Sequence, residues 1–114
     1  MFFKKQNRSQ NKIKTDSNLV RAMGYLKPYI VKDLNRKPEE MVQETIRESG
    51  FLHADIRWGV ITKRAALKCF NRFIKVAYYD PEMVHQVEHG PGYLAYYIQK
   101  TEEKMKKPEF EPLP

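Results

Sequence analysis

The sequence predicts a mainly α-helical fold in which four to five helices surround one small core, with at most one short pair of β-strands. Apolar residues recur at helical spacing in several stretches that Pro and Gly residues separate, and the 41% hydrophobic content suits a globular core. A chain of 114 residues has room for one domain. We therefore expect a basic extended arm over residues 1–16, a helical domain over residues 17–107 and a proline-containing extended tail over residues 108–114.

Two helices are expected in the first half of the domain. Ser17 is a suitable N-cap for a helix near residues 18–32, in which Pro28 should cause a kink or a break. The second helix should begin near Pro38, which fits a first turn, and should end at Gly50 in a left-handed conformation. Its core-facing residues are expected to be Met41, Val42, Thr45 and Ile46.

Residues 51–61 alternate between apolar and polar side chains, as a half-buried strand does. In this interpretation His53 faces solvent and the following residues face the core: Leu52, Ala54, Ile56, Trp58 and Val60. A strand needs a partner, and the one candidate is the stretch from Tyr93 to Ile98. The alternative is an irregular connection between helices.

The second half of the domain should contain the longest helix and two further ones. Thr62 is a suitable N-cap for the longest helix, which should end at the Asp80–Pro81 pair. That pair should begin a shorter helix that runs through His89. After the break at residues 90–92, a final helix should cover residues 93–107 and end at the following proline.

Positive charge is concentrated in two zones of the chain. Residues 1–16 sum to +4 and residues 57–79 to +6, and the net charge of the whole chain is +7. In the longest predicted helix the cations lie opposite the apolar residues, which predicts a basic face toward an anionic partner. The alternative is a solvated basic face without a specific partner. The residues expected to bind nucleic-acid phosphates are Lys4, Lys5, Arg8, Lys12 and Lys14 in the arm and Arg64, Lys68, Arg72 and Lys75 in the helix.

Aromatic residues near the basic zone could stack on nucleic-acid bases, but each has a simpler role. Trp58 is expected to lie in the core. Tyr78, Tyr79 and Tyr93 are expected to bury their rings while their hydroxyl groups reach water. In the tail, Phe110 and Leu113 are expected to bind a protein partner.

The sequence offers little for catalysis. The segment from His85 to His89 resembles the H-x-x-E-H arrangement of inverted zincins, a class of metallohydrolases, over five residues. Those enzymes are large and take a third ligand from a distant helix inside a closed chamber, which this short domain cannot supply. Cys69, the one cysteine, is expected to be a partly buried structural thiol. We expect no enzymatic activity, no metal and no other cofactor.

These features favour a non-catalytic subunit of a large multi-subunit assembly, with a ribosome-like particle as the leading hypothesis and RNA and other subunits as partners. One alternative is a helix-turn-helix-like DNA-binding regulator, in which part of residues 50–61 would form a small helix. Another is an accessory subunit of a purely protein organellar complex or virion. The single cysteine predicts an intracellular, reducing compartment, and the acid-free start of the chain is compatible with a mitochondrial one. No apolar run approaches the roughly 18 residues that a membrane span needs.

Overall fold

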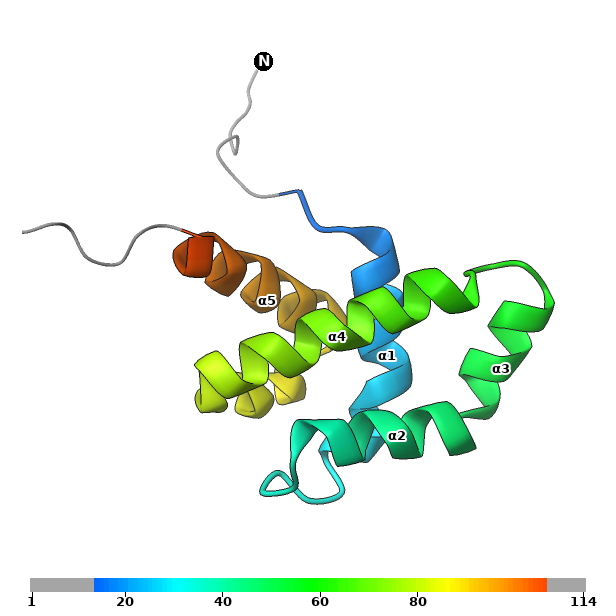
Figure 1. Cartoon of the computed structure of the whole chain (residues 1–114), viewed down its shortest axis with the longest axis horizontal. Coiled ribbons are helices and arrows are strands. Elements are labelled where there is room, and N and C mark those ends of the chain that lie inside the picture. Colours follow the sequence, from blue (N-terminus) through cyan, green and yellow to red (C-terminus); the bar gives the residue numbers. More distant parts are fainter. Residues whose placement is uncertain (1–13, 107–114) are drawn as a thin grey trace, which may run out of the picture.

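The computed structural model describes residues 14–106, and in this part of the chain it contains six helices and no strand (Figure 1). They are α1 (Ser17–Ile30), α2 (Pro38–Glu48), α3 (Gly50–Arg57), α4 (Lys63–Tyr79), the 3₁₀-helix η2 (Pro81–His89) and α5 (Pro91–Lys106). The mainly helical prediction is confirmed, although the helices outnumber the four to five expected. None of the described helices is long and apolar enough to cross a membrane.

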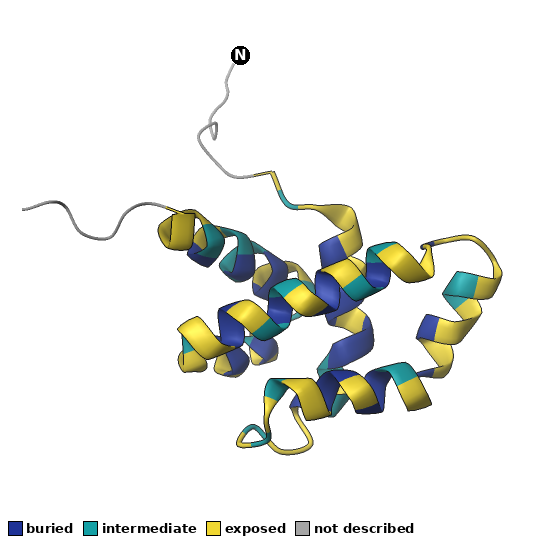
Figure 2. Ribbon diagram, in the orientation of Figure 1, coloured by how far each residue is buried: buried dark blue, intermediate teal, exposed yellow. Residues whose placement is uncertain are grey.

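Helix α1 is the centre of the domain and packs against α2, α4 and α5. In Figure 1 it lies behind α4, which crosses it, while α3 stands at one edge. Four residues at helical spacing on α1 are completely buried: Leu19, Met23, Leu26 and Ile30. Helix α4 packs over them with the buried rings of Phe70 and Phe73, and Figure 2 shows the buried residues gathering where the helices meet.

The beginning of α1 differs by one residue from the sequence prediction. Asp16 is the N-cap in place of Ser17, and its carboxylate accepts hydrogen bonds from the amides of Asn18 at 2.9 Å and Leu19 at 3.4 Å. Pro28 does not divide the helix, which continues to Ile30. Proline at this position removes the hydrogen bond to the carbonyl of residue 24, and because Gly24 is exposed, that carbonyl can bond to water instead.

The expected left-handed stop at Gly50 is wrong. Ser49 alone separates α2 from α3, and its Oγ accepts a hydrogen bond from the amide of Leu52 at 3.1 Å. Gly50 is therefore the first residue of the next helix and has no positive φ. A serine directly after α2 provides the N-cap that allows a new helix to begin at once.

The expected strand over residues 51–61 is also wrong, because residues 50–57 form α3. Leu52 is buried and Ile56 is half-buried, and their i, i+4 spacing places both on the inner side of a helix. The candidate partner strand, Tyr93 to Ile98, belongs to α5. His53 is exposed as expected, and its Nε2 lies 2.7 Å from the carbonyl oxygen of Ile46 at the end of α2.

A Schellman turn ends α3. The amide of Val60 donates to the carbonyl of Asp55 at 2.8 Å, and the amide of Gly59 donates to the carbonyl of Ile56 at 3.1 Å. Gly59 has a φ of 75°, the left-handed conformation that this turn requires. The two hydrogen bonds of this turn fix the end of α3, and residues 61–62 then lead into α4.

The predicted caps of the longest helix and of the helix after it are confirmed. The hydroxyl of Thr62 accepts a hydrogen bond from the amide of Ala65 at 3.0 Å, and Asp80 caps η2 through the amide of Glu82 at 3.2 Å. The final helix begins slightly earlier than expected, at Pro91. Cys69 is buried on α4, where burial raises the pKa of its thiol, in agreement with a structural role.

Candidate nucleic-acid interface

The outward side of α4 carries a row of exposed cations. We define the α4 basic face as Arg64, Lys68 and Lys75, all of which are exposed. Within the described part of the chain, none of them forms an ion pair. From Arg64 to Lys75 the row extends about 16 Å along a straight helix, which is enough to follow several phosphates of one nucleic-acid strand.

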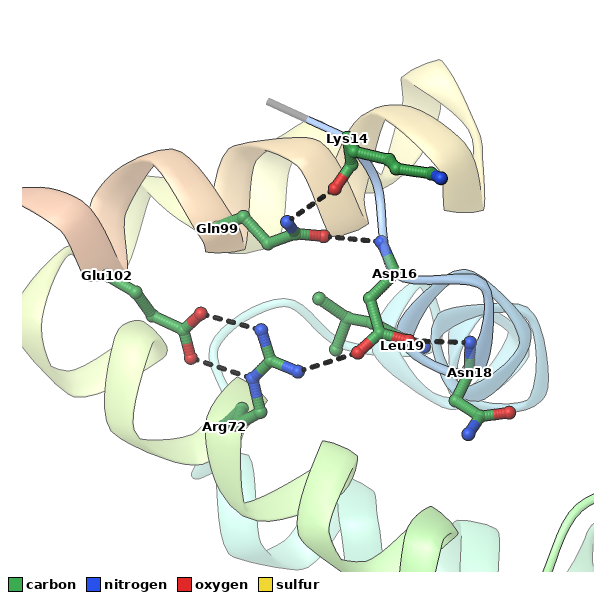
Figure 3. A network of polar contacts seen from close by, with 7 residues as sticks. All are labelled: Lys14, Asp16, Asn18, Leu19, Arg72, Gln99 and Glu102. Carbon is green, nitrogen blue, oxygen red and sulfur yellow. Dashed lines mark hydrogen bonds and ion pairs between the residues drawn. The ribbon is translucent and has the colours of Figure 1, made fainter. Parts of the chain in front are cut away.

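Arg72, also predicted to bind phosphate, instead has two carboxylate partners within the domain (Figure 3). Its Nε and Nη2 donate to the two carboxylate oxygens of Glu102 at 2.9 and 2.8 Å, and its Nη1 donates to Asp16 at 3.2 Å. The hydrogen bond to Glu102 is the main reason that the pKa of the Arg72 guanidinium lies above its ordinary value. Of the four helix cations predicted to bind phosphate, Arg64, Lys68 and Lys75 therefore remain as the candidates.

The root of the basic arm is fixed beside α4 and α5. The side chain of Gln99 on α5 donates to the carbonyl oxygen of Lys14 at 3.1 Å and accepts from the amide of Asp16 at 2.8 Å. Asp16 in turn contacts Arg72 on α4, as Figure 3 shows. The last residues of the first basic zone, Lys14 to Asp16, thus lie at the junction of α1, α4 and α5. The other residues predicted for the arm and tail lie outside the described range: Lys4, Lys5, Arg8, Lys12, Phe110 and Leu113.

Trp58 does not lie in the core, contrary to expectation. Its side chain is 79% exposed because it is the C-cap of α3, a helix whose one fully buried side chain is Leu52. Phe51, on the same helix, is 81% exposed. Tyr78 and Tyr79, at the end of α4, are about half exposed, so their rings are less buried than predicted.

A second polar cluster, not predicted from the sequence, joins the end of α1 to α2. Glu44 is buried on α2, where Lys32 donates to one carboxylate oxygen and Arg36 donates to the other at 2.6 Å. These hydrogen bonds, first that of Lys32 and then that of Arg36, lower the pKa of Glu44. Arg36 also donates to the backbone carbonyl of Tyr29. Both cations are therefore used within the domain and add nothing to the α4 basic face.

The H-x-x-E-H segment lies in η2, and its helix type changes how the residues are placed. A 3₁₀-helix has three residues per turn, so His85 and His89 point about 120° apart and not along one side as in an α-helix. Among residues 14–106, no group of three or more His, Cys, Asp or Glu side chains comes close enough to hold a metal ion. The ring of His89 packs edge-on against Tyr93, with the centroids 5.1 Å apart.

The order of α3, a turn at residues 58–62 and α4 has some likeness to a helix-turn-helix motif. However, α3 packs against α1 and α2, and it faces α4 across a groove lined by Leu52, Ile56, Lys63 and Leu67 among others. The exposed cations Arg64, Lys68 and Lys75 lie on one helix, α4. Comparison of the chain with protein-family models, with curated proteins and with solved structures found no match.

Proposed function

We propose that this chain is a non-catalytic subunit of an RNA-containing assembly and that the α4 basic face binds RNA phosphates. The observation that carries the proposal is the exposed row of Arg64, Lys68 and Lys75, which have no carboxylate partner in the described part of the chain. Asp16 and Glu102, two carboxylates that reach this helix, are both bound to Arg72. Cations that the fold leaves unpaired gain most from an external anion.

The position of the arm supports the same partner. Lys14 and Asp16 are held by Gln99 next to α4, and the remaining arm cations precede this point in the sequence. Thirteen extended residues can reach about 40 Å, which is enough to contact phosphates beyond the end of α4. A basic arm that begins beside a basic helix would neutralise phosphates along a path without reading their sequence.

A structural role also agrees with where the altered pKa values occur. In enzymes, strongly shifted groups gather in a cleft around the reacting atoms. Here the shifted tyrosines instead join helices: Tyr25 on α1 donates to Asp55 on α3 at 2.5 Å, and Tyr78 on α4 donates to Glu39 on α2 at 2.6 Å. Accordingly, we propose that the domain supplies contacts within an assembly and not a reaction centre.

The direct test compares two double variants with the same change of net charge. Arg64→Glu/Lys68→Glu alters the α4 basic face, whereas Lys37→Glu/Arg47→Glu alters exposed cations at the two ends of α2. Affinity for a folded RNA would be measured at several salt concentrations. We expect the α4 variant to lose at least about tenfold in affinity and to lower the slope of log K against log salt by about two, with a much smaller effect of the control. Equal losses in both variants would contradict a specific interface.

A pull-down of the tagged full-length chain from cells tests membership of the assembly. We expect a fixed set of proteins to accompany the chain and to be released by ribonuclease. Retention of that set after ribonuclease treatment would favour a purely protein assembly. Recovery of the chain alone, or as a dimer on DNA, would contradict the proposal and favour a DNA-binding regulator.

A further inference from the structure

Two aromatic side chains, Phe51 and Trp58, form an exposed pair on α3. They are the most exposed large hydrophobic residues in the described part of the chain, at 81% and 79%. Their separation of seven residues places them on the same side of the helix, about 10 Å apart along its axis. Such exposure leaves the faces of both rings open to an external partner.

The pair lies next in the chain to the α4 basic face. Trp58 is followed by the turn that leads into Lys63 and Arg64, and Arg57 precedes it. Lys63 lies five positions after Trp58 in the chain, so their Cα atoms lie no more than about 17 Å apart. The sequence contains no Asp or Glu between Asp55 and Asp80. The surroundings of Trp58 along the chain are therefore cationic, which is complementary to a polyanion.

The Schellman turn fixes where Trp58 is held. The hydrogen bonds from Val60 to Asp55 and from Gly59 to Ile56 close the end of α3 around this residue. The backbone of Trp58 also donates to the carbonyl of Ala54 at 2.9 Å. A ring presented from a hydrogen-bonded turn loses less conformational entropy on binding than one on a flexible loop.

We propose that Phe51 and Trp58 stack on unpaired nucleotides of the RNA strand whose phosphates lie along the α4 basic face. Exposed aromatic rings next to a row of cations are the arrangement by which proteins bind single-stranded nucleic acid, because every base offers a flat face for stacking. The inference rests on the proposed function and makes it more specific. It assigns single-stranded RNA as the ligand class and places the bases on α3.

Two other partners fit the surface less well. Protein interfaces are depleted of Lys at their centre, and Lys63 follows directly after this turn. A membrane would have to bury Asp55, which lies between the two rings on the same side of α3 and bonds to Tyr25. A nucleotide strand can leave Asp55 in its contacts with Tyr25 and Arg21, since its bases can cover the rings while its phosphates meet the cations.

Fluorescence provides a direct test because Trp58 is the one tryptophan of the chain. The protein would be titrated with a twelve-nucleotide oligouridylate, with double-stranded RNA and with heparin, a polyanion without bases. Twelve nucleotides lie within the roughly 4–16 that a single OB fold covers. We expect the oligouridylate to quench Trp58 emission strongly, while heparin binds without comparable quenching. Duplex RNA should bind through phosphates with little quenching.

Substitutions separate stacking from apolar contact. Trp58→Ala and Trp58→Leu should each weaken oligouridylate binding by about fivefold or more, whereas Trp58→Phe should retain most of the affinity because it keeps a ring. Phe51→Ala should weaken binding in the same way. Heparin affinity should be unchanged in all four variants.

The outcomes distinguish this inference from the function on which it rests. If oligouridylate affinity is unchanged in Trp58→Ala but falls in Arg64→Glu/Lys68→Glu, the stacking site is refuted while phosphate binding stands. If neither RNA form binds, both proposals fail. If anionic phosphatidylserine vesicles shift Trp58 emission to the blue and oligouridylate has no effect, the surface binds membranes and the inference is overturned.

Discussion

Arg72 on α4 and Glu102 on α5 form two parallel hydrogen bonds, from Nη2 to Oε1 at 2.8 Å and from Nε to Oε2 at 2.9 Å. The third guanidinium nitrogen donates to Asp16, so one side chain joins α4, α5 and the start of α1. Arg64, Lys68 and Lys75 on the same helix have no such partner in the described residues. The cations of α4 therefore divide into one that holds the domain together and others that are exposed to external anions.

Arg72→Ala should reduce stability more than RNA binding. It removes a paired carboxylate contact that is about one-third exposed, so we expect the free energy of unfolding to fall by about 1 kcal/mol. Lys75→Ala, one helical turn further on, is the matched comparison and should change stability by less than about 0.5 kcal/mol while lowering RNA affinity. Urea unfolding and RNA titration of both variants provide the measurement. A larger loss of affinity in Arg72→Ala than in Lys75→Ala would contradict this division of roles.

Glu44 should make stability depend on pH in the acid range. Its pKa in the folded protein lies below the ordinary value of 4.5, so its contribution is fully present above that value and is lost as the pH falls through the lower, folded pKa. Glu44→Gln should therefore lower the free energy of unfolding at pH 7, and the difference from the original chain should shrink toward pH 3. Urea unfolding of the original chain and of Glu44→Gln at pH 7 and pH 3 measures this difference in the free energy of unfolding.

The control for this prediction is Glu40→Gln, an exposed position on the same helix. It should change the free energy of unfolding by less than about 0.5 kcal/mol at either pH. A pH-independent loss in Glu44→Gln would mean that packing and not charge determines the role of this residue.

The elements that the sequence predicts well are those specified by neighbouring residues. Thr62 and Asp80 cap their helices through amides two or three positions away, so their role can be recognised locally. The alternation in residues 51–61 is equally local, but it did not decide the structure. Ser49 begins a helix there, and the i, i+4 pair Leu52 and Ile56 faces inward once that helix has formed.

The candidate site could be predicted only in part for the same reason. The row of cations on α4 follows from helical spacing alone. The partners of Arg72, however, lie 56 and 30 residues away at Asp16 and Glu102, and nothing in the spacing reveals them. The exposure of Trp58 likewise depends on how α3 packs against the rest of the domain. The sequence pattern had predicted a strand for this segment and so could not reveal that packing.

Lys63→Glu should affect stability and binding in opposite directions. Lys63 begins α4, and the first turn of this helix contains no acidic residue, so a cation faces the positive end of the helix dipole. Replacement by Glu should raise the free energy of unfolding by about 0.5 kcal/mol and lower RNA affinity. Lys63→Gln should give intermediate values in both measurements. A gain of stability without loss of affinity would place Lys63 outside the interface.

Gly59→Ala should test whether the turn before α4 controls the position of Trp58. No atom lies within 4 Å of the added Cβ, but the left-handed φ of 75° disfavours alanine. The resulting backbone strain should lower the free energy of unfolding by about 1 kcal/mol. Gly92→Ala, in the first turn of α5 and with equally open space, should be neutral or stabilising because its φ is not positive. Thermal unfolding of Gly59→Ala, Gly92→Ala and the original chain measures these changes in stability.

The same pair of variants separates stability from binding. If the turn sets the direction of Trp58, Gly59→Ala should also reduce the quenching of Trp58 fluorescence by oligouridylate at temperatures where the variant is fully folded. Gly92→Ala should leave that quenching unchanged. Because Gly59 has no side chain that could contact RNA, a loss of quenching in its variant would come from the changed backbone, and unchanged quenching would show that the turn matters for stability alone.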